Sequence, residues 1–466
     1  MRKFAKHGIV AVVAGAFIGG CEGDGQQAKD GEWKWGDPPK WEAPKWEAPK
    51  WDGPKFAAPK WEAPKWDAPK WDWDFAKADK KDPGSSALTP EAPAAAGGGT
   101  VAPAAPVASS AEDGVVYDTT STSIEAYVNI ASRVYADAHQ EATRLQSAIG
   151  KFLGDPTPEH QVDVKRAWLL ARVAYGRTEA FQFSGSPETS RISVWPISES
   201  NIDYVQGDAT AGIINDASVA IDRDTLIAKN RDGDAKNGTT GFQVIEFLIW
   251  GQDLYEDGPG RRPATDFDAG DAIKDRRRQF LQVATDLLVD DLKALADAWK
   301  VNAEGNYAAT FQGLEQATAV SNMLSGLVAL SNAELATARI SNALSSGDQV
   351  DEQSRFSDNT HNDLLVNIQS LYYAYFGVYD NYRGRGINQL VAAKNADLND
   401  EISESLRAAL SIARSIRPPF DQIQVAGDDD PQRKALMDLS AKLSGFSDLI
   451  KQAGDALEAP VAVAGG

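Results

Sequence analysis

The stretch TTGFQVIEFLIWGQDL, residues 239–254, combines a strongly apolar run with one carboxylate, Glu246. Seven of the nine residues in 242–250 are apolar. At 100° per residue, Gln243, Glu246 and Trp250 fall on one face of a helix, and apolar side chains cover the rest. A helix that is apolar almost all round is buried, so the stretch predicts an interior helix with a single polar stripe.

A buried carboxylate at position 246 needs a partner, because burying an ionised carboxylate is costly unless it is paired, hydrogen-bonded or bound to a metal. The first interpretation is structural: an internal ion pair with an arginine. The candidate arginines are Arg172, Arg177, Arg261 and Arg262. The second interpretation is functional: Glu246 is a ligand position in an interior site. The residues themselves leave both open.

Around this stretch, the C-terminal part of the chain shows helical periodicity, and strand-like alternation is nearly absent. Helical stretches are expected near 124–134, after Pro158, and over 268–300, 306–346, 359–382, 387–416 and 431–457. We therefore predict an all-α domain over residues 117–458, built of two packed antiparallel helical bundles, with a short tail at 459–466.

The N-terminus has the features of a bacterial secretion signal. Three basic residues lie among the first six, an apolar run from 9 to 18 follows, and Gly19-Gly20-Cys21 ends it. Small residues before a cysteine resemble a lipobox, so residues 1–20 are predicted to be a lipoprotein signal peptide and Cys21 the lipidated residue. No later segment approaches the ~20 apolar residues of a membrane-spanning helix. The mature protein is therefore expected to be anchored to a membrane rather than to span it.

Residues 21–116 are expected to form an arm and a linker. Within 41–70, an aromatic-acid-x-Pro-Lys pentad such as WEAPK is repeated in six copies, of which the fourth departs from the pattern at Phe56-Ala57. Proline at every fifth residue excludes a continuous helix and favours an extended chain. One interpretation is a spacer between lipid and domain. The other is a binding surface, in which tryptophans of residues 33–73 stack on peptidoglycan, another glycan or an envelope protein.

Charge limits the possible partners. The formal net charge is −20, of which residues 1–112 contribute −1 (15 Lys and Arg against 16 Asp and Glu), so residues 113–466 carry −19. An acidic body argues against nucleic acid and anionic membrane surfaces as partners and favours cations. Because the chain has a single cysteine, it can form neither an intrachain disulfide nor a thiolate metal cluster.

The chain lacks the signatures HExxH, GxSxG, GxGxxG and the Walker loop. Five segments instead resemble, in order, those of the imelysin-like family of bacterial envelope proteins. GFQVIEFLIWGQD is similar to the family's GxHxxE signature with its apolar run and Trp-Gly. The other four are RVAYGRTEAFQF (172–183), VWPISESNIDYV (194–205), RRPATDF (261–267) and SRFSDNTHNDL (354–364). The resemblance covers roughly residues 118–457.

The resemblance implies two helical-bundle halves, with the signature near the cleft where they meet. It also implies two kinds of function. The founding activity is an insulin-cleaving peptidase, for which the signature His and Glu were proposed as metal or catalytic residues. Many relatives are iron-regulated or iron-uptake proteins of the envelope. The cofactor that the resemblance implies is iron or another divalent cation.

This chain departs from the family signature at Gln243, which stands where the family has histidine. An amide oxygen is a poor ligand for zinc or ferrous iron. A glutamine amide also does not titrate near neutral pH, so it cannot serve as a general base. We therefore expect a protein without peptidase activity.

The predicted metal site takes residues from the signature and from two other matching segments. Its members are Glu246, Gln243, Glu179 and His361, and the residues expected to line the same pocket are Arg172, Tyr175 and Asp358. Two of them have structural alternatives. Glu179 and Arg172 lie on one helix face and can close an internal salt bridge. His361 can be a first-turn residue of a helix capped by Ser357 or Asp358.

The leading hypothesis is a lipid-anchored, non-catalytic envelope protein that binds or takes up a metal, iron in the first place. The alternatives are a metallopeptidase-like hydrolase and an adaptor that holds the cell wall or a surface assembly through the arm. Glu22 follows Cys21, where aspartate commonly signals retention in the inner membrane. The expected location is therefore the outer membrane, facing the periplasm.

Overall fold

The computed structural model of the protein describes residues 116–117, 122–182, 190–255 and 258–461. The chain divides into two units, residues 1–100 and 101–466, and every described residue belongs to the second. The predicted signal peptide, Cys21 and the pentad arm lie outside the described residues.

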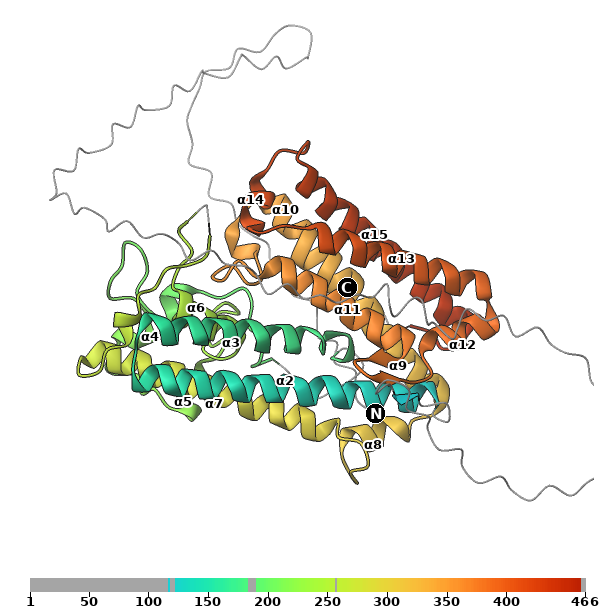
Figure 1. The fold of residues 1–466 in the computed structure, drawn as a ribbon, viewed down its shortest axis with the longest axis horizontal. Helices are drawn as coiled ribbons and strands as arrows, with labels where there is room; N and C mark the ends of the chain where they lie inside the picture. The colour runs from blue at the N-terminus through green and yellow to red at the C-terminus, as the bar shows by residue number, and fades with distance from the viewer. Residues whose placement is uncertain (1–115, 118–121, 183–189, 256–257, 462–466) are drawn as a thin grey trace, which may run out of the picture. The chain divides into compact units, whose positions relative to one another are not determined.

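The first half of the described chain is a bundle of three long helices (Figure 1). These are α2 (Ser123–Gly154), α3 (Pro158–Gly176) and α7 (Ala272–Ala298). Helix α2 packs against both others, and the short turn 155–157 makes α2 and α3 antiparallel. Local chemistry sets where they begin: Thr122 and Glu125 form a capping box on α2, and Pro158 occupies the first turn of α3.

The second half forms another bundle, coloured orange to red in Figure 1. Its helices are α9 (Gln316–Val328), the π-helix η5 (Ala329–Ser341), α11 (Thr360–Phe376), α13 (Ala396–Ser415) and α15 (Pro431–Ala456). Helix α13 packs against α11 and α15, and α15 also packs against η5 and α9. Contacts between α3 and α11 join the two bundles. The predicted all-α fold with two packed bundles is confirmed.

Shorter elements connect the long helices. The helical ones are η2 (Glu179–Phe181), η3 (Glu199–Asn201), α4 (Gly212–Asn215), α5 (Arg223–Lys229), α6 (Phe242–Trp250), η4 (Ala264–Phe267), α8 (Tyr307–Gln312), α10 (Asn342–Ser346), η6 (Gln349–Asp351), α12 (Ile387–Lys394) and α14 (Phe420–Val425). A small sheet has the order β1 (Val116–Tyr117), β3 (Tyr382–Arg383) and β2 (Val378–Tyr379). In it, β1 runs parallel and β2 antiparallel to β3, with Val116 opposite Tyr382.

Three predicted helices are interrupted in the structure. The stretch 387–416 divides into α12 and α13 at Asn395, whose side chain caps α13 by accepting the Leu398 N–H. The stretch 306–346 divides into α8, α9, η5 and α10, because α8 ends at Gly313 and Glu315 caps a new helix by accepting the Thr318 N–H. The stretch 359–382 stops being helical at Phe376. There Gly377 has φ 70°, a left-handed conformation that ends the helix, and the β2–β3 hairpin follows.

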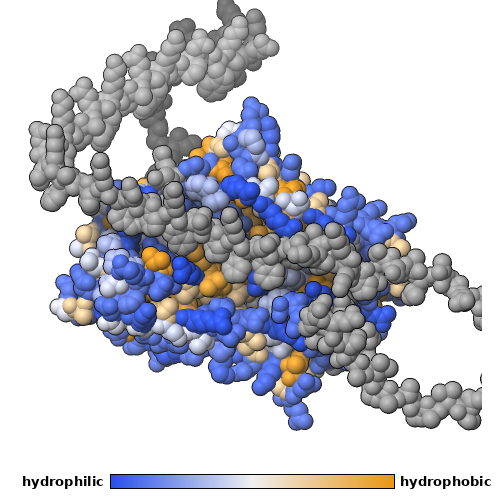
Figure 2. Space-filling model, viewed as in Figure 1, coloured by the Kyte–Doolittle hydropathy of each residue, from blue (hydrophilic) through white to orange (hydrophobic). Residues whose placement is uncertain are grey.

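The apolar faces of both bundles share one continuous core. In the view of Figure 2, hydrophilic residues cover most of the described surface and hydrophobic residues gather along its middle. Every helix in the described part of the chain is too short or too polar to cross a membrane.

Candidate functional site

Helix α6 is the predicted interior helix, and all nine of its residues are buried. Glycines define both of its ends. Gly241 has φ 90°, and a Cβ placed there would lie 2.5 Å from the carbonyl oxygen of Ile192. Gly251, at the other end, has φ 74°. Glycine adopts these conformations without strain, so the signature folds as one short buried helix between two tight turns.

The carboxylate of Glu246 lies against the loop that precedes α11. Its Oε1 atom accepts a hydrogen bond of 2.9 Å from the backbone N–H of Ser357 and one of 2.6 Å from the Ser357 hydroxyl. Its Oε2 atom has no hydrogen-bond partner among the described residues. Within those residues, no arginine forms an ion pair with this carboxylate. The predicted Glu246–arginine pair is therefore not formed there.

Burial raises the pKa of Glu246 from its ordinary value of 4.5 to about 8. The Ser357 hydroxyl acts in the opposite direction, and the nearby negative charge of Asp363 raises the pKa further. In the absence of a cation, Glu246 therefore holds a proton at neutral pH. A strongly perturbed carboxyl group of this kind marks a candidate site, because the cause of the shift is specific to its surroundings.

A second carboxylate, Glu352, lies near enough to Glu246 for their charges to interact. It follows η6 directly and is fully buried. Neither of its carboxylate oxygens has a hydrogen bond of ordinary geometry to a described residue, although the Thr360 hydroxyl lies close enough to favour the ionised form. Burial raises the pKa of Glu352 well above its ordinary value, Asp358 and Asp421 add to the effect, and the nearby Thr360 hydroxyl offsets only part of it. We refer to Glu246 and Glu352 as the carboxylate pair.

Four charged side chains form a buried network beside the carboxylate pair. Arg172 donates two hydrogen bonds, of 3.1 and 3.3 Å, to Asp363. Arg339, from the π-helix η5, contacts Glu179 at 2.6 Å and donates to Asn367 at 2.6 Å. Burial opposes the charge of Arg172, but Asp363 and Glu179 hold its pKa above the ordinary value. The network links α3 and η2 to η5 and α11, and so connects the two bundles.

The structure brings three of the predicted residues, Glu179, Arg172 and Tyr175, into this network. The Arg172 guanidinium lies 5.6 Å from the centre of the Tyr175 ring. The Tyr175 hydroxyl accepts a hydrogen bond of 3.2 Å from Gln182, and burial raises the pKa of Tyr175. The predicted alternative, a salt bridge between Glu179 and Arg172, is replaced by the pair that Glu179 forms with Arg339.

The remaining predicted residues have other neighbours. Gln243 exchanges hydrogen bonds of 3.2 and 3.3 Å with the Ser193 hydroxyl. His361 lies in the first turn of α11, with Nδ1 3.0 Å from the carbonyl oxygen of Asp358, which itself has φ 56°. Burial lowers the pKa of His361 to about 4; the Asp358 carbonyl opposes this shift and Arg417 adds to it. His361 is therefore neutral at pH 7.

The hydrogen bonds and ion pairs of the predicted ligands show which of them already have a protein partner. Within the described residues, no three His, Cys, Asp or Glu side chains are placed to hold one metal ion. Glu179, Gln243 and His361 each have a protein partner, whereas three oxygens of the carboxylate pair have no hydrogen bond of ordinary geometry to these residues. The four-residue metal site stays a prediction.

Sequence reasoning missed Glu352, Asp363 and Arg339. Asp363 lies inside the matching segment 354–364, and Glu352 lies two residues before it. Acidic residues in and around that segment were therefore a usable signal. Arg339 lies in a stretch for which the sequence pattern predicts a long helix and no functional motif. Nothing in the sequence therefore connects Arg339 with Glu179.

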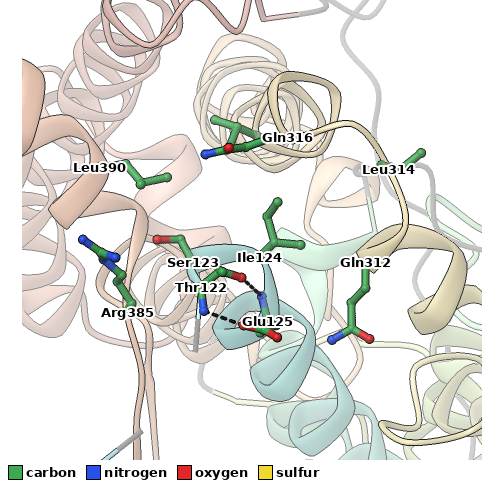
Figure 3. Close-up of a pocket in the computed structure, with 10 residues that line it drawn as sticks. Thr122, Ser123, Ile124, Glu125, Gln312, Leu314, Gln316, Arg385 and Leu390 are labelled. Carbon is green, nitrogen blue, oxygen red and sulfur yellow. Dashed lines mark hydrogen bonds between the residues drawn. The ribbon is translucent and has the colours of Figure 1, made fainter. Parts of the chain in front are cut away.

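A separate pocket of about 470 Å³ lies at the start of α2 (Figure 3). Its polar lining includes Gln312, Gln316 and Arg385, together with Thr122 and Glu125 of the capping box. Figure 1 shows the start of α2 and helix α6 at opposite ends of the first bundle. None of the predicted site residues lines this pocket.

Comparison with known proteins agrees with the resemblance. The sequence pattern of the imelysin family matches residues 131–450, more than half of the chain. A structure assigned as an iron-regulated protein A precursor from Parabacteroides distasonis ATCC 8503 has a TM-score of 0.56 and 18% identity, over 72% of this chain and 96% of that one. An imelysin-like protein from Psychrobacter arcticum 273-4 has a TM-score of 0.53 and 14% identity, over 74% and 99%.

At these identities, the two solved structures show a shared fold. No curated protein matches the sequence significantly. The match to the family pattern extends from α2 to α15 and includes the α6 signature, so the chain belongs to the imelysin family.

Proposed function

We propose that the protein is a non-catalytic, lipid-anchored envelope protein that binds a divalent cation, with iron as the first candidate, at the carboxylate pair. One observation carries this proposal: among the described residues, Oε2 of Glu246 and both carboxylate oxygens of Glu352 are buried without a hydrogen bond of ordinary geometry, although the Thr360 hydroxyl lies close enough to Glu352 to favour its ionised form. Buried polar groups in native proteins are nearly always hydrogen-bonded, so each exception needs an explanation, such as a bound ion.

A cation would remove the cost of burying this pair. Two ionised carboxylates repel each other and lose their hydration, whereas a divalent cation neutralises both charges. Carboxylate oxygens suit hard divalent cations, and iron sites built largely from carboxylates occur inside helical bundles. The acidic body favours cations in general. The term iron-regulated, used for one structure of similar fold, makes iron the first metal to test.

The residues around the pair favour binding over hydrolysis. A metallopeptidase needs a general base that activates a metal-bound water. Gln243 has no titratable group, and its amide is held by Ser193. His361 lies in the first turn of α11 against the Asp358 carbonyl, and the charge of Arg417 acts on it. Neither residue therefore supplies the base next to Glu246.

Cation binding is tested with the full chain in detergent, titrated with Fe²⁺ under anaerobic conditions in a calorimeter. We expect one site, and we expect Glu246→Gln and Glu352→Gln each to weaken it by about tenfold or more, because each removes a charged ligand. Asp234→Asn is the matched control, since Asp234 is exposed in a turn. Equal Fe²⁺ binding by wild type and both glutamine variants would refute the site.

The lipid anchor is tested by Cys21→Ser. Cleavage and lipidation require the cysteine thiol, so wild type should sediment with membranes, resist high salt and dissolve in detergent. The variant should lose this behaviour. In a bacterium with two membranes, wild type is expected in the outer-membrane fraction, because Glu22 follows the cysteine. The same membrane fraction for both proteins would contradict the anchor.

A further inference from the structure

The described part of the chain exposes five large apolar side chains, and four of them lie on segments that hydrogen bonds join to one another. Leu254 and Tyr255, in the loop after α6, are 52% and 37% exposed. Val425, at the end of α14, is 71% exposed, and Met437 of α15 is 50% exposed. The fifth is Val162 of α3. Single exposed apolar residues are ordinary on a protein surface, whereas a group of them marks an interaction site.

The loop after α6 and the end of α14 meet at residues 347–349. Asp253, which precedes Leu254, accepts a hydrogen bond of 2.6 Å from Gln349. Val425 lies beside Gly347, because a Cβ placed on this glycine would be 3.8 Å from the valine side chain. Leu254 and Val425, from the first and the second half of the described chain, are therefore neighbours on the surface.

Helix α15 is attached to the same region through Arg433, one turn before Met437. The Arg433 guanidinium donates hydrogen bonds of 2.5 Å to the carbonyl oxygen of Gln424 and of 2.9 Å to that of Leu344. Residues four apart lie on one face of a helix, so Met437 points to the same side as Arg433. We refer to the four exposed side chains as the apolar patch: Leu254, Tyr255, Val425 and Met437.

The side chains of the apolar patch are of types that protein interfaces use. The guanidinium of Arg261 lies over the Tyr255 ring, 3.9 Å from its centre. Tyrosine, methionine and arginine are all enriched in protein–protein interfaces, and tyrosine and arginine often contribute most of the binding energy. The unbranched side chain of Met437 can adapt its shape to a partner. The composition of the patch therefore suits a protein as its occupant.

Negative charge borders the apolar patch. Residues 428–430, between α14 and α15, are three consecutive aspartates, the first two of them exposed, and exposed Asp438 directly follows the methionine of the patch. Arg433 and Lys434 each pair with one of the three aspartates, at 3.2 and 3.4 Å. Within the described ranges, no basic side chain forms an ion pair with Asp438. Like charges facing each other disfavour a second copy of this chain and an anionic lipid surface, whereas a basic partner is attracted.

We propose that the apolar patch is a docking surface for another protein, whose contacting segment combines apolar side chains with lysine or arginine. The apolar side chains of the partner cover the patch, and its basic side chains face the aspartates at the border. Docking needs no bound cation, so it is a second binding activity beside the one proposed for the carboxylate pair.

The partner is first captured in the bacterium that produces the protein. A photo-reactive phenylalanine analogue replaces Val425 or Met437 in the full chain, and Val162 is the matched control because it is an exposed apolar residue outside the patch. Irradiation should attach one and the same protein to positions 425 and 437, and none to position 162.

The captured protein is then purified and titrated with the full chain in detergent. We expect Val425→Ser and Met437→Ser each to raise the dissociation constant by about tenfold, a usual effect of removing a side chain at the centre of an interface. Val162→Ser should change it by less than about twofold. Because the border is acidic, binding should weaken as NaCl is raised, and Asp438→Asn should reduce this salt dependence.

Four results would overturn the docking surface. These are attachment to a second copy of this chain, attachment to lipid alone, no attachment beyond that at position 162, and equal affinity of wild type and both serine variants for the captured protein. Val425 and Met437 are exposed on different helices, so each serine variant tests the patch with the core intact. Each of the four results leaves the Fe²⁺ titration of the carboxylate pair unaffected.

Discussion

At pH 8, replacing Glu246 with glutamine is expected to raise the free energy of unfolding of the cation-free protein by about 3–5 kcal/mol. The folded state holds the proton of Glu246 with a pKa of about 8, whereas the unfolded chain releases it near the ordinary value of 4.5. Each pKa unit corresponds to ~1.4 kcal/mol. Glutamine keeps an acceptor for the Ser357 N–H and hydroxyl without a proton to lose.

The sign of this effect follows from proton binding. Below pH 4.5, both states hold the proton and the group contributes no pH dependence. Between pH 4.5 and 8, the unfolded chain binds fewer protons than the folded one, so the wild type loses stability as the pH rises. The variant has no such group. The stability difference between variant and wild type should therefore be small near pH 4.5 and grow towards pH 8.

Urea unfolding in metal-free buffer at pH 4.5, 6.5 and 8 measures this difference. Glu304→Gln is the control, because Glu304 is exposed and surface substitutions usually change stability by less than about 0.5 kcal/mol. A difference between Glu246→Gln and wild type that stays constant across this pH range would contradict the buried, proton-holding state of Glu246.

Replacing Arg172 with methionine is expected to lower the free energy of unfolding by about 3–5 kcal/mol. The Arg172 and Asp363 side chains are 0% and 1% exposed. Methionine removes the positive charge but fills similar space, so Asp363 becomes a buried charge without its ion-pair partner. Its remaining donors, Ser354 and Asn359, are neutral.

The control for this prediction is Arg223→Met. Arg223 pairs with Asp290 at 2.8 Å, but their side chains are 47% and 57% exposed. Exposed pairs contribute about 0–1 kcal/mol, so the control should lose no more than that. Urea unfolding at pH 7 compares the two variants. Similar losses in both would show that the buried network does not hold the two bundles together in the way described.

Helix α6 could be predicted from the sequence because its information is local. The apolar run, the bounding glycines and the polar stripe of Gln243 and Glu246 all lie within 241–251, and the structure buries the whole helix. The contact that satisfies Glu246 could not be predicted. Ser357 lies 111 residues further along the chain and meets Glu246 only when the loop before α11 lies against α6. Periodicity identifies a buried polar stripe, but not the loop that faces it.

The rest of the candidate site shows the same limit. Arg172 and Glu179 share a helix face in the sequence, yet each is paired with a residue from the second bundle, Asp363 and Arg339. The first pair depends on how α11 approaches α3, and the second on how η5 approaches η2. The family match named the segment of His361, but in the structure this side chain lies against the Asp358 carbonyl of its own turn. Glu246 and Glu352 are brought near each other by tertiary packing, which the sequence pattern does not predict.

The most direct test of the central claim is a crystal of the protein grown anaerobically with Fe²⁺, with diffraction measured at the iron absorption edge. We predict an anomalous density peak between the carboxylates of Glu246 and Glu352, and no peak at that place in Glu246→Gln crystals. Two results would contradict the account. One is an iron peak at another place only, and the other is the absence of a peak between the two carboxylates when Fe²⁺ has been added to saturation.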